Sequence, residues 1–153
     1  MVLRVGDVAP DFTLPDQHGR STSLSAQVGP VLVVFFPSAF TPVCHDELRA
    51  LHDLAPAARA LDAHVWGVSC DSMFVLRALD DSEGLGFPLL SDFWPHGEVA
   101  RAYGALDESL GTARRVTVLV DRQGRVAGLW QSGPDRARDP DEYLSALADL
   151  PRP

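Results

Sequence analysis

The sequence of 153 residues contains no lysine and only two cysteines, Cys44 and Cys70. All 13 cationic side chains are arginines, and 21 carboxylates outnumber them, which leaves a net charge of −8. A chain with this charge and no basic stretch repels a phosphate backbone, so nucleic acid is not an expected partner. Two cysteines are too few for a disulfide framework, which favours free thiols in a reducing compartment.

Long apolar runs are missing as well. The longest strongly apolar run, residues 31–36, is far below the roughly 18 residues of a membrane span, and residues 1–12 contain no apolar signal core. We therefore expect a cytoplasmic protein without a membrane segment. No Pro-, Ser- or Gly-rich stretch interrupts the chain, and its length suits one packed core, so we predict a single domain over residues 1–153.

The spacing that a metal site requires is also absent. Neither an i, i+4 histidine pair nor a Cys-x-x-Cys companion occurs among the five histidines. These are His18, His45, His52, His64 and His96. We expect no bound metal. His45 adjoins Cys44 but projects about 100° around a helix from it, which favours a solvated side chain over a catalytic base.

Hydrophobic patterning predicts a chain in which strands and helices alternate. Residues 11–24 alternate around a polar turn and indicate an N-terminal β-hairpin, and the apolar residues 31–36 indicate a central strand covered on both faces. Apolar residues then recur at three- and four-residue spacing, which predicts an amphipathic helix from Pro42 to Leu61. Residues 64–70 return to a strand pattern.

The second half of the chain continues this order. It predicts a helix over 71–81, a strand over 87–90, a short helix over 96–103 capped by Gly104, a hairpin of strands 116–120 and 126–130, and a final helix opening at Asp139 and Pro140. A strand–helix–strand unit is nearly always a right-handed parallel crossover. The whole order indicates an α/β chain of the thioredoxin-like fold class, with a mixed central sheet flanked by helices and preceded by the hairpin.

The loop between the central strand and the long helix contains Cys44. Function is often located at this place in open α/β sheets. Thr41 followed by Pro42 indicates an N-cap with proline at the first helical position, which makes Cys44 the third helical residue. Unpaired backbone N–H groups and the positive end of the helix there favour the ionised thiolate, which is the nucleophilic form of cysteine.

Three further side chains lie where they could assist such a thiolate. Thr41 and Glu47 are three residues before and after Cys44, on one edge of the helix, so Thr41 could donate a hydrogen bond and Glu47 could orient an arginine. Pro37 has no N–H and could shield the sulfur from water. The alternatives are a buried, inert Cys44 beside an ordinary helix start and an exposed Glu47 without a role.

The segment FFPSAFTPVC resembles the active-site motif of the peroxiredoxin family, in which Pro37, Thr41 and Cys44 occupy the motif positions. The likeness continues through CHDEL, GVSCDS, LLSDFWPHGEVARAYGAL and RRVTVLVDRQGRV, and SDFWPHG is most similar to the one-cysteine branch of alkyl hydroperoxide reductase E type. By this resemblance Arg115 is the active-site cation, with Arg114 as its neighbour.

The resemblance implies a thiol-dependent peroxidase that needs no cofactor. Cys44 would attack the O–O bond of hydrogen peroxide or an organic hydroperoxide and become a sulfenic acid, while Thr41 and Arg115 hold peroxide and thiolate in line. An external thiol, such as mycothiol with mycoredoxin or a thioredoxin-like protein, would recycle the enzyme. The family likeness further implies a homodimer or a higher homo-oligomer.

Three alternatives remain open at this point. Cys70 could act as the resolving thiol of a two-cysteine peroxiredoxin, although a small apolar side chain packed at a strand end is the interpretation we favour. Dithiol–disulfide exchange usually needs Cys-x-x-Cys, whereas Cys44 is followed by His45, Asp46 and Glu47. A thioredoxin-fold binding or holdase module would use neither cysteine.

Overall fold

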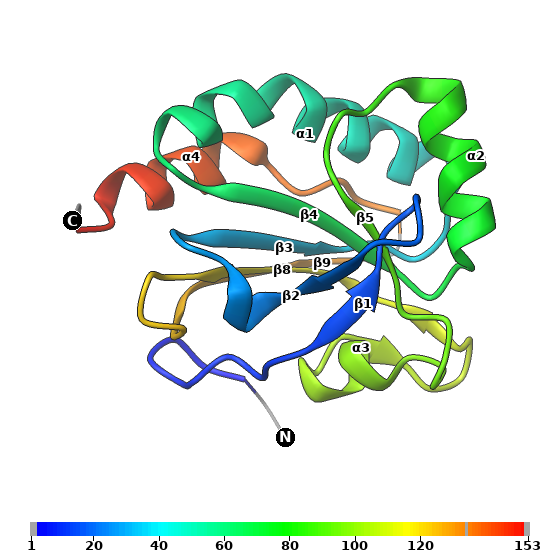
Figure 1. Ribbon diagram of the computed structural model, residues 1–153, viewed down its shortest axis with the longest axis horizontal. Helices are drawn as coiled ribbons and strands as arrows, with labels where there is room; N and C mark the ends of the chain where they lie inside the picture. The colour runs from blue at the N-terminus through cyan, green and yellow to red at the C-terminus, as the bar shows by residue number, and fades with distance from the viewer. Residues whose placement is uncertain (1–2, 134, 152–153) are drawn as a thin grey trace.

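The computed structural model of the protein describes residues 3–133 and 135–151. At its centre is a five-stranded sheet with the order β5-β4-β3-β8-β9 (Figure 1). β3 is the middle strand and runs parallel to β4 and antiparallel to β8, so the predicted mixed sheet is confirmed. The strands are β3 (Val31–Phe35), β4 (His64–Ser69), β5 (Leu89–Ser91), β8 (Arg115–Val120) and β9 (Val126–Ser132).

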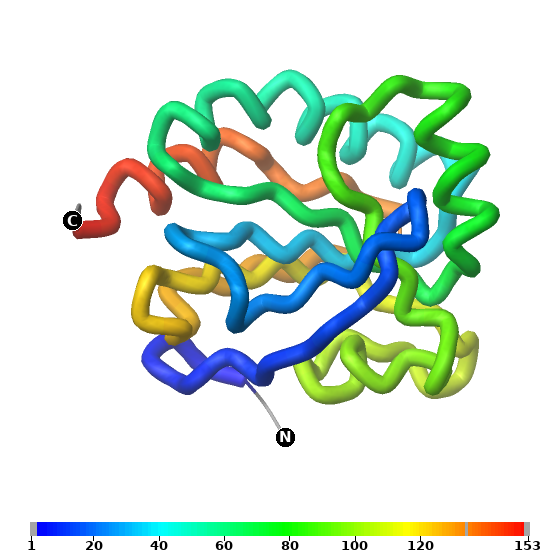
Figure 2. The backbone as a smooth tube through the Cα atoms, viewed as in Figure 1, coloured from blue at the N-terminus to red at the C-terminus, as the bar shows by residue number. Residues whose placement is uncertain are grey.

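Helices cover one face of this sheet, and a hairpin with a short helix covers the other (Figure 1). The first group is α1 (Pro42–Ala60), α2 (Met73–Glu83) and α4 (Pro140–Asp149). The second is the predicted hairpin of β1 (Thr13–Pro15) and β2 (Ser21–Ser23), the 3-10 turn η1 (Leu24–Ala26) and α3 (Glu98–Ala102). Within the described ranges, no helix is long and apolar enough to cross a membrane. The chain then returns from β9 to place α4 beside α1 (Figure 2).

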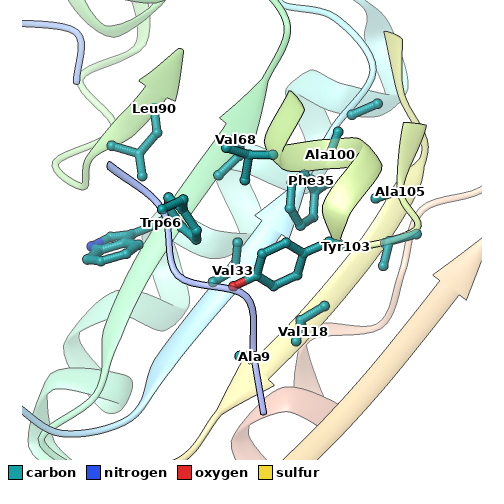
Figure 3. Packing of buried hydrophobic residues seen from close by; sticks show 14 of the residues in the cluster. Ala9, Val33, Phe35, Trp66, Val68, Leu90, Ala100, Tyr103, Ala105 and Val118 are labelled. Atoms are coloured by element: carbon teal, nitrogen blue, oxygen red, sulfur yellow. The ribbon is translucent and has the colours of Figure 1, made fainter. Parts of the chain in front are cut away.

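The central strand is buried on both faces because its side chains alternate between two cores. Leu32 and Val34 pack on the side of α1, α2 and α4, whereas Val33 and Phe35 pack on the side of the hairpin and α3. Figure 3 shows the second core, in which Tyr103 lies against Phe35. Burial of each of these large apolar side chains stabilises the folded state by roughly 1.5–3 kcal/mol. These cores hold the end of β3 rigidly.

The predicted elements are present, with shifted boundaries that have local causes. α2 covers 73–83 rather than 71–81 because the Ser72 side chain accepts the Val75 N–H and so caps the helix. β5 covers 89–91 rather than 87–90, since Pro88 cannot donate to a ladder. α1 ends one residue earlier than predicted and α3 is shorter than 96–103. The small hairpin of β6 (Leu106–Asp107) and β7 (Thr112–Ala113) was not predicted, because strands this short carry no alternation.

Candidate active site

Cys44 lies in the first turn of α1, which follows the loop after β3. Thr41 is the N-cap residue, Pro42 opens the helix, and Cys44 is therefore its third residue, as the sequence indicates. Cys44 has no exposed surface. A thiol at this position faces the positive end of a 19-residue helix, which favours the thiolate.

Arg115 reaches the sulfur of Cys44 from the first position of β8. Because β8 runs antiparallel to β3, with Val34 opposite Thr117, its first residue lies beside the loop that leaves β3. Arg115 Nη1 donates a hydrogen bond to Cys44 Sγ at 3.2 Å and one to Glu47 Oε1 at 2.6 Å. A buried guanidinium against the sulfur stabilises negative charge there much more than it would in water.

A second arginine, Arg138, completes this cluster and was missed at the sequence level. Its Nε donates to Glu47 Oε2 at 2.8 Å, its Nη2 donates to Glu47 Oε1 at 2.9 Å, and its backbone N–H donates to Oε2 at 2.8 Å. The guanidinium thus forms a bidentate pair with the carboxylate through two parallel hydrogen bonds. The only available signal was an arginine directly before the Asp139 N-cap, which does not reveal that its side chain is buried.

The carboxylate of Glu47 is buried between the two guanidinium groups. Burial by itself would raise the pKa of Glu47, but the hydrogen bonds and charge of Arg138, together with the charge of Arg115, outweigh it and lower the pKa below its ordinary value. Glu47 is therefore an ionised anchor. It fixes the direction in which Arg115 presents its Nη1 to the sulfur.

The cluster is tied to the sheet and to the last helix through a buried hydroxyl. Arg138 Nη1 donates to Thr117 Oγ1 at 3.1 Å, and Thr117 shares a hydrogen bond of 2.7 Å with the Tyr143 hydroxyl. Thr117 of β8 thereby holds Arg138, and Tyr143 of α4 holds the Thr117 hydroxyl in place. Satisfied buried networks of this kind fix side-chain positions.

Thr41 and Pro37 lie on the loop that precedes the helix. The Thr41 hydroxyl donates to the carbonyl of Ser38 at 3.1 Å, so its side chain does not cap the helix. Pro37 and Arg115 are two of the residues that line a pocket of about 360 Å³. The rest of its lining is Asp107, Leu110, Thr112, Ala113, Arg114, Gln131, Ser132 and Gly133.

Cys70 belongs to the other side of the sheet. It packs in the core formed with the hairpin and α3, whereas Cys44 packs in the core formed with α1, α2 and α4. Burial and the negative charges of Asp92 and Asp71 raise the pKa of Cys70 to about 11. Cys70 is therefore a protonated thiol at neutral pH, separated from Cys44 by the sheet.

His45 projects away from this cluster, as its place on the helix predicts. Its Nδ1 lies 3.3 Å from Glu83 Oε1, with the ring partly exposed, so it pairs with α2 and not with the sulfur. Within residues 3–133 and 135–151, no three His, Cys, Asp or Glu side chains are arranged to hold a metal ion. The expectation that no metal is bound stays a prediction.

Comparisons with known proteins agree with the motifs. The AhpC/TSA family matches residues 5–128. The chain is 41% identical over 151 residues to alkyl hydroperoxide reductase E of Mycobacterium tuberculosis, which covers 97% of this chain and 99% of that protein. It is 33% identical over 131 residues to peroxiredoxin Bcp of Escherichia coli, which covers 81% of this chain and 83% of that protein.

Solved structures give the same result for the fold. Peroxidoxin BcpB of Mycobacterium tuberculosis matches with a TM-score of 0.89 at 30% identity, over 98% of this chain and 99% of that chain. AhpC of the same organism matches with a TM-score of 0.83 at 27% identity, over 97% of this chain and 98% of that chain. The predicted thioredoxin-like fold class is confirmed, and the chain belongs to the AhpC/TSA family of peroxiredoxins, with the alkyl hydroperoxide reductase E likeness that its motifs indicate.

Proposed function

We propose that Cys44 is the peroxide-reducing thiolate of this enzyme, which is a thiol-dependent peroxidase and works with one cysteine. The observation that carries the proposal is the contact of 3.2 Å between Arg115 Nη1 and the sulfur of the fully buried Cys44. An inert core cysteine has no need of a cation. A nucleophile needs one, both to hold its negative charge and to stabilise the oxygen that leaves.

The reaction is a displacement at oxygen. The Cys44 thiolate attacks one oxygen of the peroxide, an S–O bond forms, and the O–O bond breaks. The other oxygen leaves as hydroxide or alkoxide and takes up a proton to become water or an alcohol. Cys44 is oxidised by two electrons to a sulfenic acid, the reversible first oxidation state.

The other predicted residues have proposed roles beside Cys44. Arg115 donates to the thiolate and to the peroxide oxygen that accumulates charge, and Glu47 with Arg138 keeps that guanidinium in place. Thr41, whose hydroxyl donates to Ser38 in this structure, turns to donate to a bound peroxide. Pro37 has no N–H and shields the sulfur. The pocket that Pro37 and Arg115 help to line is the proposed route of substrate entry, and Cys44 lies buried outside its lining.

An external thiol then recycles the sulfenic acid. It condenses with Cys44 to a mixed disulfide and water, and a second thiol releases Cys44 as the external disulfide forms. We infer the external donor from the position of Cys70, which packs in the opposite core. Mycothiol with mycoredoxin, or a thioredoxin-like protein, has the required chemistry.

We further infer a homodimer or a higher homo-oligomer. Large apolar side chains are exposed on loops near the site: Phe40 at 60%, Phe93 at 50%, Trp94 at 82% and Leu110 at 72%. A hydrogen bond of 2.6 Å between His96 Nε2 and the Gly111 carbonyl draws the loops of Trp94 and Leu110 together. Exposed apolar groups gathered in this way favour association.

Stopped-flow reaction with one equivalent of peroxide, followed by a sulfenic-acid trapping reagent and intact-mass measurement, tests the proposal. We expect rapid peroxide consumption and one trapped adduct, both abolished in Cys44→Ser. A mass loss of about two hydrogens without an adduct, itself abolished in Cys70→Ser, would instead establish an internal disulfide. A folded protein that leaves peroxide unchanged would favour the binding-module alternative.

A further inference from the structure

The loop that carries the candidate site is fastened to the neighbouring strand end by Asp71. β3 and β4 are parallel, so the loops that leave them emerge at the same edge of the sheet. Asp71 lies shortly after β4, and its Oδ2 accepts the backbone N–H of Ala39 at 2.9 Å. Ala39 belongs to the 37–41 loop, between Pro37 and Thr41. A charged acceptor on one loop therefore holds the backbone of the other.

Asp71 is in turn held by two buried hydroxyl groups. Ser69 Oγ donates to the same carboxylate oxygen at 2.8 Å, and the Asp71 N–H donates back to Ser69 Oγ at 3.3 Å. Ser91 Oγ donates to the Asp71 carbonyl at 2.6 Å. Ser69 ends β4 and Ser91 ends β5, and their exposed fractions are 0% and 3%. Ser69 thus orients the carboxylate of the half-buried Asp71, and Ser91 fixes its backbone.

The loop that Asp71 holds has a backbone that needs such support. Phe40 has a φ of 64°, in the left-handed region that a bulky side chain rarely adopts. Such a conformation persists only where the surroundings determine it. The Asp71 bond fixes Ala39 immediately before Phe40, and Thr41 Oγ1 donates across the loop to Ser38. The shape of the loop decides where the Thr41 hydroxyl stands.

We propose that Asp71 is a positioning residue of the peroxidase site: its carboxylate holds the 37–41 loop so that Thr41 and Pro37 meet a peroxide beside Cys44. The inference rests on the proposed function of Cys44. The thiolate itself is stabilised by other elements, namely β8 through Arg115 and the start of α1. Loss of Asp71 therefore misaligns the peroxide, while Arg115 and the start of α1 stay in place beside the sulfur.

Two reactions of Cys44 in Asp71→Ala separate alignment from general damage. We expect the stopped-flow rate constant with hydrogen peroxide to fall roughly tenfold or more, because small misplacements of reacting groups have such effects. The rate of Cys44 alkylation by iodoacetamide, followed by peptide mass, should stay unchanged or rise. A more mobile loop would expose a sulfur that is fully buried in the wild type. Asp71→Asn should restore most of the peroxide rate, because its amide oxygen can accept the same bonds.

Two control variants complete the test. Ser69→Ala loosens the carboxylate but keeps the Ala39 acceptor, so it should show a weaker change in the same directions, and it serves if Asp71→Ala does not fold. Asp81→Ala removes an exposed carboxylate of α2 and should behave as the wild type. Equal peroxide rates in folded Asp71→Ala and wild type, or parallel losses in both reactions, would overturn the inference. A wild type that ignores peroxide would defeat the proposed function instead.

Discussion

At the scale of single residues, Cys44 and Cys70 differ by environment alone. Cys44 meets a helix N-terminus and the guanidinium of Arg115 at 3.2 Å. Cys70 is surrounded by apolar side chains and the charges of Asp92 and Asp71, which disfavour its thiolate. This contrast supports the proposal that Cys44 and not Cys70 is the reactive thiol, because nucleophilicity depends on the ionised sulfur.

Replacing Arg115 should affect peroxide reduction more than other thiol chemistry. In Arg115→Ala we expect the peroxide rate constant to fall by roughly a hundredfold or more, as for the loss of one donor to a developing oxyanion. Alkylation by neutral iodoacetamide should fall much less, because no oxygen leaves in that reaction. The fold should survive, since Glu47 keeps its bonds to Arg138.

Stopped-flow fluorescence and timed alkylation measure the two rates. Arg114→Ala is the matched control, because this exposed neighbour lines the pocket without a described bond to the sulfur. Equal losses in the two reactions of Arg115→Ala would mean that Arg115 only stabilises the thiolate.

Cys70 should neither be alkylated nor take part in peroxide reduction in the native protein. With a pKa of about 11, its ionised fraction at pH 8 is roughly one in a thousand, so iodoacetamide should modify Cys70 only after unfolding. Cys70→Ser should leave peroxide consumption and the yield of trapped sulfenic acid unchanged. Peptide mass after labelling at pH 8, with and without denaturant, checks the first result. Native labelling of Cys70 ahead of Cys44 would contradict it.

At the scale of elements, the site is formed by the first turn of one helix, the first residue of a strand and the residue that precedes another helix. α1 supplies Cys44 and Glu47, β8 begins with Arg115, and Arg138 lies just before α4. Glu47 is the hub, since both guanidinium groups bond to its carboxylate. Removal of one partner from a buried ionic cluster is costly, because the remaining charges stay buried without compensation.

Glu47→Gln should therefore destabilise the protein by about 3–5 kcal/mol, as measured by denaturant unfolding at neutral pH. The folded pKa of Glu47 is lowered, so its stabilisation is present above the unfolded value of about 4.3 and is lost as pH falls through the folded value. The difference in the free energy of unfolding between wild type and Glu47→Gln should become smaller as the pH is lowered from about 6 to about 3.

The exposed Glu108 provides the control, because its partner Arg101 is also exposed. Glu108→Gln should have little effect on unfolding. If the difference in the free energy of unfolding between wild type and Glu47→Gln stays constant over the same pH range, the carboxylate charge does not stabilise this cluster.

At the scale of the whole molecule, the two ends of the sheet have different characters. The loops at the carboxyl ends of β3, β4 and β5 carry the 37–41 loop of the candidate site, the Asp71 contacts and the exposed Phe40, Phe93 and Trp94. This is the end of an open α/β sheet where sites usually occur.

Trp94→Asp should shift the protein from the proposed homo-oligomer towards monomers. The indole is 82% exposed, so the substitution introduces a charge among the exposed apolar side chains near the site without disturbing a core. Sedimentation velocity at micromolar concentration checks the state of both proteins. Val28→Asp is the control, because Val28 is 87% exposed at the opposite end of β3. An unchanged Trp94→Asp oligomer, or a monomeric wild type, would contradict the assignment of the interface.

Local pattern in the sequence was sufficient for the order of the larger helices and strands, though not for β6 and β7, and for the third helical position of Cys44. Both depend on neighbours in the chain: apolar spacing sets a helix, and a threonine followed by proline sets its start. Boundaries shifted by one or two residues where caps and proline intervened. Arg115 could be named only through family resemblance, because no local pattern marks an arginine before a strand.

The tertiary structure alone decided which distant side chains meet. Cys44 and Arg115 are separated by 71 positions, and Glu47 and Arg138 by 91. The same holds for Asp71, which reaches Ala39 across 32 positions, and for the two cysteines, which the sheet separates into opposite cores. Such contacts depend on strand order and on which face each side chain occupies, and these are properties of the packed sheet rather than of any short segment of sequence.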